Sequence, residues 1–415
     1  MDTLRKYLYD LVIRDLDLTE EISDEVLYRK IDAVLFTEGK KKKLSGRERL
    51  KYREVIFAAL RRLDILSIAM DDAAVTEVMV NNAEKIYVER GGGLEPYPET
   101  FTTAEKLPDV IQQIAAAVNR RINEASPMVD ARLSDGSRVN IVLPPIALDG
   151  PAVTVRRFPK EPISMRELVA WGSITEEAAD FLKTLVRCGY NIFISGGTGA
   201  GKTTFLGALA EYIPDTERVI TIEDSAELRL RNVKNIVRLE SRPANLEGDY
   251  EVTIRDLIRN ALRMRPDRII VGEIRSAEAL DMLQAMNTGH DGSISTGHAN
   301  SARDMLSRIE TMVLMGMDLP LSAIRSQIAS GLDILVHLGR LRDRSRRVMG
   351  IYEVTGVEEN EVGICPLYEF REEGMDGDRI RGTLQKSTHC LQNTEKLYAR
   401  GGQLPGIQAA AEGTE

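Results

Sequence analysis

The chain has 415 residues, of which 43% are hydrophobic and 29% are charged, a composition typical of globular proteins with room for two or three domains. Its net charge of −9 argues against a general nucleic-acid binder, because a phosphate backbone requires a basic face. Three cysteines without a C-x-x-C pair and no bilayer-length apolar run exclude a cysteine-based zinc framework and favour a cytoplasmic, reducing location.

Residues 1–70 are predicted to form a helical N-terminal region. LRKYLYDLVI and REVIFAALRRLDIL have apolar residues at helical spacing. Between them, GKKKKLSGRERLK contains four successive lysines, Lys40–Lys43. Such a run is either a solvated loop or helix face, or a contact for anionic lipid.

Residues 74–160 are predicted to form a smaller α/β domain. VTEVMV and KIYVER are typical of strands, and AEKLPDVIQQIAAAVNRRI has helical periodicity. MVDARLSDGSRVNIVLPP indicates a hairpin with SDGS as its turn, and PAVTVRRF is the closing strand. A connection with two prolines follows, so residues 161–172 are predicted to be an interdomain linker.

Residues 173–356 alternate short apolar strands with helical segments. The strands are NIFIS, RVITIE, RIIVG and SISTG, and the helices between and after them have 3.6-residue periodicity. This alternation predicts an α/β domain with a mainly parallel sheet and helices on both faces. Residues 357–415 are predicted to be a strand-containing extension whose last twenty or so residues form a frayed tail.

The segment from Gly196 to Thr203 matches G-x-x-x-x-G-K-[ST], with a strand before it and a helix after it. In such a P-loop the backbone N–H groups converge on phosphate oxygens at a helix N-terminus. Lys202 is expected to reach the β- and γ-phosphates and Thr203 to ligate Mg²⁺, so the sequence predicts binding of ATP or GTP. The expected nucleotide-binding residues of the loop are Gly196, Gly197, Thr198, Gly199, Ala200, Gly201, Lys202, Thr203 and Thr204.

Two further strands are followed by acidic residues. In RPDRIIVGEIR the strand leads to Glu273, and a carboxylate at the carboxyl end of a parallel strand faces the crevice where ligands bind. Glu273 is expected to hold magnesium through water or to polarise the attacking water, although a strand ending in Glu is also common. In TIEDSAEL, the residues Glu223, Asp224 and Glu227 form either a solvated turn or part of a metal and water site. The second interpretation is favoured because RVITIE should belong to the same sheet, which makes Glu223 a further magnesium candidate.

Two of the four histidines, His290 and His298, fall in TGHDGSISTGHAN, each after a glycine. Their spacing, without a cysteine partner, is poor for zinc. His298 follows a strand and is expected beside the γ-phosphate as a sensor or polarising group. For each histidine a structural role is the alternative.

GGTGAGKTT, TIEDSAEL, RPDRIIVGEIR and STGHAN, in this order, resemble the Walker A loop, aspartate box, atypical Walker B motif and histidine box of the secretion-superfamily hexameric ATPases. These proteins serve type II secretion, type IV pili and conjugative type IV secretion. The resemblance covers about residues 74–356 and implies a RecA-like P-loop domain after a PAS-like N-terminal domain. VDARLSDGSRVN, GPAVTVRRF and ERVITIEDSAELRL are most similar to the tight-adherence (Flp) pilus branch.

The resemblance also implies functions for four arginines, Arg132, Arg138, Arg156 and Arg157, which would reach the nucleotide within or between subunits. A guanidinium can neutralise the charge that develops on a transferred phosphoryl group. The alternative is a set of plain surface arginines, and strand alternation places Arg157 opposite Arg156.

The family further implies a homohexamer that uses ATP and Mg²⁺ at the inner face of the cytoplasmic membrane, with peripheral membrane contact only. The expected partner is a polytopic inner-membrane platform protein. The leading hypothesis is therefore a motor for pilus assembly or protein export. The alternatives are a conjugative type IV secretion ATPase, a helicase-like nucleic-acid motor, which the low aromatic content of 5% disfavours, and a non-hydrolysing nucleotide switch.

Overall fold

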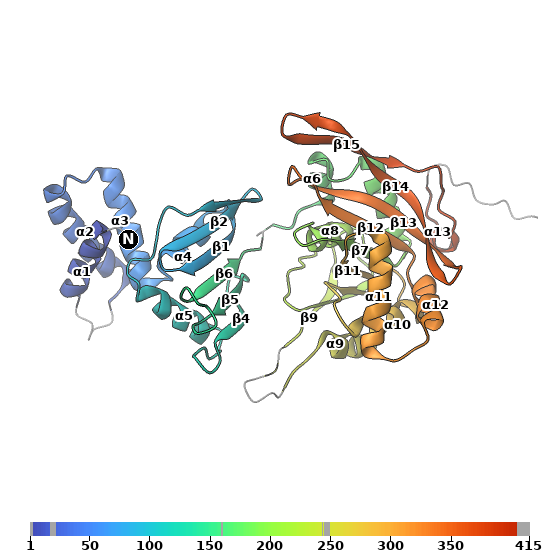
Figure 1. The fold of residues 1–415 in the computed structure, drawn as a ribbon, viewed down its shortest axis with the longest axis horizontal. Coiled ribbons are helices and arrows are strands. Elements are labelled where there is room, and N and C mark those ends of the chain that lie inside the picture. The colour runs from blue at the N-terminus through green and yellow to red at the C-terminus, as the bar shows by residue number, and fades with distance from the viewer. Residues whose placement is uncertain (1–2, 17–21, 159–160, 243, 245–249, 405–415) are drawn as a thin grey trace, which may run out of the picture. The chain divides into compact units, whose positions relative to one another are not determined.

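The computed structural model describes residues 3–16, 22–158, 161–242, 244 and 250–404. They fall into two compact units, Met1–Pro159 and Lys160–Glu415 (Figure 1). Within the described part of the chain, no helix combines the length and the apolar character that crossing a membrane requires.

The first unit begins with a helical region. The helices are α1 (Thr3–Asp15), α2 (Asp24–Lys41), α3 (Gly46–Arg61) and α4 (Ile65–Asp71). The first three share a core that includes Leu8, Ile31 and Ile56. Ser45 begins α3 as a capping box with Glu48, which satisfies N–H groups that have no partner within the helix. The two stretches predicted to be helical thus lie in α1 and in α3 and α4.

A six-stranded antiparallel sheet follows among the described residues of this unit, in the order β3-β2-β1-β6-β5-β4. Alternation along its strands buries one face, with Val78 and Val155 among the buried residues, against α4 and α5 (Lys106–Ala117). The predicted hairpin is confirmed as β4 and β5. The strands are β1 (Val75–Asn82), β2 (Lys85–Arg90), β3 (Gly93–Pro96), β4 (Met128–Arg132), β5 (Arg138–Val142) and β6 (Ala152–Arg156).

The second unit is built on a nine-stranded sheet, as far as the described residues define it, in the order β15-β14-β13-β12-β7-β11-β10-β8-β9. Six neighbouring strands, β12, β7, β11, β10, β8 and β9, pair in parallel. The strands β13, β14 and β15 continue the sheet beyond β12 in antiparallel pairing. The predicted α/β fold with a mainly parallel sheet is therefore confirmed. The strands are β7 (Ile192–Gly196), β8 (Arg218–Glu223), β9 (Asn235–Glu240), β10 (Arg268–Val271), β11 (Ile294–His298), β12 (Ile334–Arg340), β13 (Arg346–Glu358), β14 (Glu361–Asp376) and β15 (Arg379–Lys386).

Helices cover both faces of this sheet and bury two hydrophobic cores (Figure 1). One core is closed by α6 (Met165–Ala170), α7 (Glu176–Arg187), α8 (Lys202–Ala210) and α13 (Glu395–Ala399). The other is closed by α9 (Ile254–Ala261), α10 (Glu278–Asn287), α11 (Ala302–Gly316) and α12 (Leu321–Gly331). The strands between them are near-continuous apolar runs, as expected for a sheet that is buried on both faces.

Two expectations on domain limits differ from the structure. Residues 161–172, expected to be a linker, contain α6, whose Ser164 forms a capping box and whose Met165 and Leu168 enter the core of the second unit. The boundary expected between residues 356 and 357 falls inside β13, since β13, β14 and β15 extend the same sheet.

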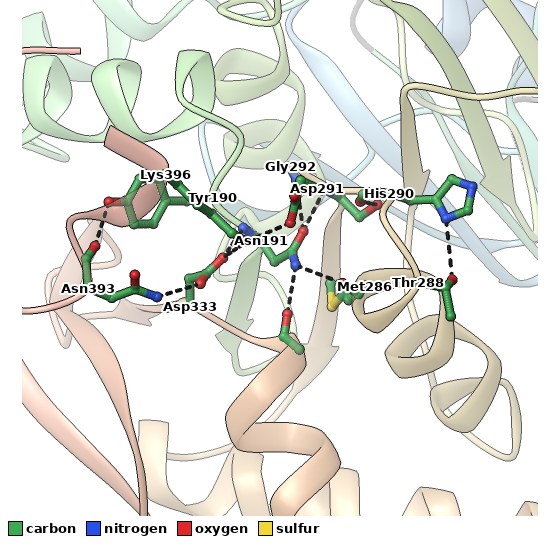
Figure 2. A network of polar contacts seen from close by, with 12 residues as sticks. Tyr190, Asn191, Met286, Thr288, His290, Asp291, Gly292, Asp333, Asn393 and Lys396 are labelled. Atoms are coloured by element: carbon green, nitrogen blue, oxygen red, sulfur yellow. Dashed lines mark hydrogen bonds and ion pairs between the residues drawn. The ribbon is translucent and has the colours of Figure 1, made fainter. Parts of the chain in front are cut away.

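Part of the expected frayed tail is a packed strap, which we define as residues 390–404; residues 405–415 lie outside the described residues. Leu397 and Leu404 are buried in the core. Figure 2 shows how polar contacts bind the strap: Lys396 Nζ pairs with the buried Asp333 carboxylate at 2.6 Å, and the Tyr190 hydroxyl donates to the Asn393 carbonyl at 2.6 Å. These partners precede β12 and β7, so the strap lies at the amino ends of the parallel strands.

Candidate active site

The P-loop, residues 196–203, connects β7 to α8. Gly199 and Gly201 have φ angles of 72° and 90°, which glycine adopts without strain. A Cβ atom at Gly196 would lie 2.6 Å from the carbonyl oxygen of Leu338 on β12, so backbone packs directly against backbone there. The loop therefore requires these glycines and is held against the sheet.

Lys202 begins α8, and its side chain is buried beneath the loop. Its Nζ donates to the carbonyl oxygens of Gly196 at 3.2 Å and Gly197 at 3.1 Å and lies 3.2 Å from Nδ1 of His298. His298 ends β11, whose pairing with β7 sets it beside Gly196. The strand end thus brings an imidazole to the P-loop lysine.

The two predicted acids meet at the same edge of the sheet. β8 and β10 are adjacent parallel strands, and the Gly272 N–H donates to the Ile222 carbonyl at 2.8 Å. A Cβ atom at Gly272 would lie 2.9 Å from Cγ of Glu223, so the glycine makes room for that side chain. Glu223 and Glu273 therefore extend from neighbouring strand ends, as the carboxyl ends of parallel strands require.

Glu223 is an almost fully buried carboxyl group, with 3% of its surface exposed. Its Oε2 accepts hydrogen bonds from the N–H groups of Glu227 at 2.8 Å and Leu228 at 3.0 Å, whereas Oε1 has no hydrogen-bond partner among the described residues. Burial raises the pKa of Glu223 to about 7, although the hydrogen bonds from these two N–H groups act to lower it. At neutral pH this group is therefore suited to accept or release a proton.

Glu273 is held as an anion by its neighbours. Arg275 contacts both carboxylate oxygens at 3.0 Å, and His298 Nε2 lies 3.1 Å from Oε1. Burial alone would raise the pKa of Glu273, but Arg275, His298 and Lys202 outweigh burial and lower it. The pKa of His298 is lowered by burial and by Lys202. A continuous polar chain thus joins Lys202, His298, Glu273 and Arg275.

Asp224 extends this chain, because Arg275 lies 3.5 Å from its carboxylate. His290 does not join it. His290 precedes β11 at the amino end of the strand, where its Nδ1 lies 3.5 Å from the Thr288 hydroxyl (Figure 2), while His298 stands at the carboxyl end. His290 therefore lies one strand length away from His298 and away from the P-loop, which favours the structural role that was its alternative.

Three of the four predicted arginines form a row in the first unit. Strand register places Arg132 opposite Arg138, and Arg138 opposite Arg156. Directly opposed residues share one face of a sheet, here the face away from the buried core. Arg157 is not part of this row: its guanidinium donates to the carbonyl oxygens of Asp72 at 2.5 Å and Val75 at 2.7 Å, a structural contact. The row belongs to a different unit from the P-loop.

Sequence reasoning did not single out two arginines that contact the site. Arg275 follows Glu273 by two residues, and that proximity was the available signal. Arg346 opens β13, and its Nε donates to the carbonyl oxygen of Gly199 at 2.8 Å across 147 positions of sequence. Arg346 pairs in register with Arg340, so two like charges face each other beside the P-loop. Both guanidinium groups thus lie beside the loop that is expected to hold the phosphates.

The residues present fit a magnesium ion that arrives with a nucleotide. Among the described residues, no cluster of three His, Cys, Asp or Glu side chains is arranged to hold a metal alone. Magnesium needs no such cage, because it usually retains waters and binds one or two carboxylates together with substrate phosphates. Thr203 on α8 and the unpartnered Oε1 of Glu223 are suitable donors of this kind.

A model of the family described as type II/IV secretion system protein matches residues 61–398. A Mycobacterium tuberculosis protein named for conjugal transfer is 36% identical over 314 residues, which cover 74% of this chain and 89% of its own. The type IV secretion system protein VirB11 of Brucella suis is 32% identical over 324 residues, covering 72% of this chain and 87% of its own.

Among solved structures, that of the pilus retraction motor PilT with bound ADP matches with a TM-score of 0.51 and 20% sequence identity. The match covers 82% of this chain and 87% of PilT. At this identity the likeness concerns the fold, an α/β P-loop domain preceded by an N-terminal α/β domain.

Proposed function

The chain belongs to the type II/IV secretion system protein family, a family of secretion ATPases, and we propose that it is a hexameric motor driven by ATP hydrolysis. The motor would power assembly of a tight-adherence-like type IV pilus, or protein export, through an inner-membrane platform protein. The observation that carries the proposal is the chain from Lys202 through His298 to Glu273, with Glu223 on the next strand.

The contacts suggest a division of labour among these side chains. Bound Mg²⁺ would neutralise phosphate charge, with the Thr203 hydroxyl as its protein donor. Lys202 would exchange the loop carbonyls for the β- and γ-phosphates. Glu273, kept anionic by Arg275, would orient the attacking water, and Glu223 would accept its proton because its pKa lies near neutrality. His298 contacts both Lys202 and Glu273 and would act as a sensor, because a contact with the γ-phosphate would change its contacts with these two residues.

The arginine row would supply positive charge from the first unit. Arg132, Arg138 and Arg156 share one sheet face, so they can meet a polyphosphate together. We expect this contact to cross a subunit boundary, which would make hydrolysis depend on assembly.

A conjugative type IV secretion ATPase is the second candidate. It is favoured by the names of the two sequence relatives described above, one for conjugal transfer and one for type IV secretion. Both candidates share the motor and differ in the membrane machine, so co-purification of the chain with a platform protein of one system or the other separates them.

The test of the motor is ATPase rate against protein concentration. Specific activity is expected to rise with concentration, because a complete site needs a neighbouring subunit. Arg156→Ala is expected to lose activity and to regain part of it when mixed with inactive Glu273→Gln, since mixed rings contain some sites with both residues. The exposed Arg121→Ala is the matched control and should behave like the parent.

A flat specific activity together with no rescue in mixtures would refute the assembled motor and favour a monomeric nucleotide switch. Strong stimulation by DNA that salt abolishes would instead support the nucleic-acid motor.

Arg346→Ala is expected to raise the KM for ATP about tenfold with a smaller change in kcat. A hydrogen bond to a charged group contributes about 1.5–3 kcal/mol, and an exposed arginine should lie at the lower end. The effect should fall on KM because Arg346 orients the Gly199 peptide of the P-loop, and this loop binds the nucleotide before the chemical step. Steady-state kinetics check this, with Arg344→Ala on the same hairpin as control. An unchanged KM would contradict it.

A further inference from the structure

The connection between α2 and α3 gathers positive charge on a chain whose net charge is −9. Residues 40–51 contain seven basic residues and one acidic residue, a net charge of +6. We define the basic patch as the exposed side chains at this end of the helical region. Its members are Lys40, Lys41, Lys42, Lys43 and Arg47, with the apolar side chains Tyr7, Phe36 and Leu50.

Most of this charge is uncompensated. Lys41 pairs with Glu38 at 2.7 Å, but none of the other four basic members forms an ion pair with a carboxylate in the part of the chain that the structure describes. The single acid of the segment, Glu48, is engaged in the cap of α3, where it accepts from the Ser45 N–H at 2.8 Å and hydroxyl at 2.7 Å.

Helix stability does not account for the arrangement. Lys40 and Lys41 in the last turn of α2 are favourable to the helix dipole. Arg47, however, lies in the first turn of α3, where a positive charge opposes the dipole. Lys42 is the C-cap residue of α2 and is also favourable to that dipole, whereas Lys43 lies between the two helices and belongs to neither. The surplus charge therefore indicates an external anionic partner.

Three large apolar side chains are exposed at the same end. Phe36 and Leu50 are 59% and 62% exposed, and each lies within about two helical turns of the connection. Tyr7 on α1 is 42% exposed and reaches this end, because its hydroxyl donates to Glu38 at 3.0 Å. Lys40 Nζ stands 3.9 Å from the centre of the Phe36 ring. A single exposed apolar residue is ordinary, but three from three helices amid lysines form a mixed surface.

We propose that the basic patch docks on an anionic lipid surface. Clustered lysines are attracted to anionic headgroups, and exposed aromatic and leucine side chains can enter the headgroup boundary beside them. A nucleic-acid site would favour the planar, bidentate arginine guanidinium, whereas this patch is dominated by the lysine point charge. The docking concerns the helical region alone and does not depend on ATP hydrolysis.

The test is co-sedimentation of the full chain with vesicles of phosphatidylcholine alone or with 30% phosphatidylglycerol. The parent is expected to bind only the anionic vesicles and to be released by 0.5 M NaCl, because salt screens surface charge. Each basic residue near an anionic surface contributes about fivefold to binding, so Lys42→Glu/Lys43→Glu should weaken it at least about 20-fold. Phe36→Ser should weaken it severalfold without a change of charge.

The matched control is Lys85→Glu/Arg121→Glu, which makes the same change in net charge at two exposed residues of the first unit and should keep binding. Equal loss in the two double variants, or a parent that ignores anionic vesicles, would overturn the proposal. So would binding of a 30-nucleotide single-stranded DNA that depends on the patch when vesicles do not bind. ATP turnover of each variant should equal that of the parent. A parent without turnover but with patch-dependent vesicle binding would refute the motor and leave this proposal standing.

Discussion

Replacing Glu273 by glutamine is expected to lower kcat for ATP hydrolysis by about 10²–10⁴-fold, the range for losing a group that orients water or moves its proton. Glutamine keeps the shape but not the charge that Arg275 and His298 hold in place. ATP binding should persist, because Lys202 and the P-loop are untouched. Single-turnover hydrolysis and equilibrium nucleotide binding, measured on the same samples, separate the two effects.

The control for this variant is Asp215→Asn, which removes an exposed carboxylate paired with Lys234 on the same unit. Its kcat should match that of the parent. Turnover by Glu273→Gln within a factor of three of the parent would assign water activation elsewhere, with Glu223 as the next candidate.

The second large effect is on stability and depends on pH. The pKa of Glu223 is about 7 in the folded chain and 4.5 as its ordinary value. The folded state therefore binds this proton more tightly, so stability rises as pH falls from about 7 to about 4.5 and is lost as pH rises again. The shift corresponds to about 3 kcal/mol, the cost of keeping the charged carboxylate buried above neutrality.

Glu223→Gln is consequently expected to be more stable than the parent by about 2–3 kcal/mol at pH 8 and by nearly nothing at pH 4.5, while it loses ATPase activity. Urea unfolding followed by the fluorescence of Trp171, the single tryptophan and a residue of the second unit, measures the difference. The exposed Glu359→Gln is the control. A stability difference that does not change with pH would contradict the assignment of this pKa to Glu223.

The sequence could predict those parts of the site in which a residue's position next to a strand or helix in the chain also determines where it lies in space. A P-loop lies between one strand and one helix, and Glu223, Glu273 and His298 each stand at or just after the carboxyl end of a parallel strand, so they meet at one edge. The contact of Arg346 with Gly199 could not be predicted, because it depends on β12 being the neighbour of β7. The order of strands in a sheet cannot be deduced from the local pattern of apolar residues.

The elements that sequence analysis missed have no long repeating apolar pattern, each for its own reason. β3 and β9 are edge strands, whose half-exposed residues lack the apolar run of a central strand. α6 has only six residues, which is too short for helical periodicity to be detected, although its capping box, Ser164 with Glu167, is visible in the sequence. The strap was misread because its packing depends on single residues such as Lys396 and Leu397 rather than on a repeating pattern.

The strap also bears on how the chain folds during synthesis. Burial raises the pKa of Asp333, and the Lys396 ammonium is the charge that opposes this shift. During synthesis Asp333 is added to the chain about sixty residues before Lys396, so for that interval the buried carboxyl group lacks its ion-pair partner. We therefore expect the second unit to reach its full stability only after the strap has been synthesised. A chain terminated before residue 396 should have a destabilised sheet that proteases attack more readily.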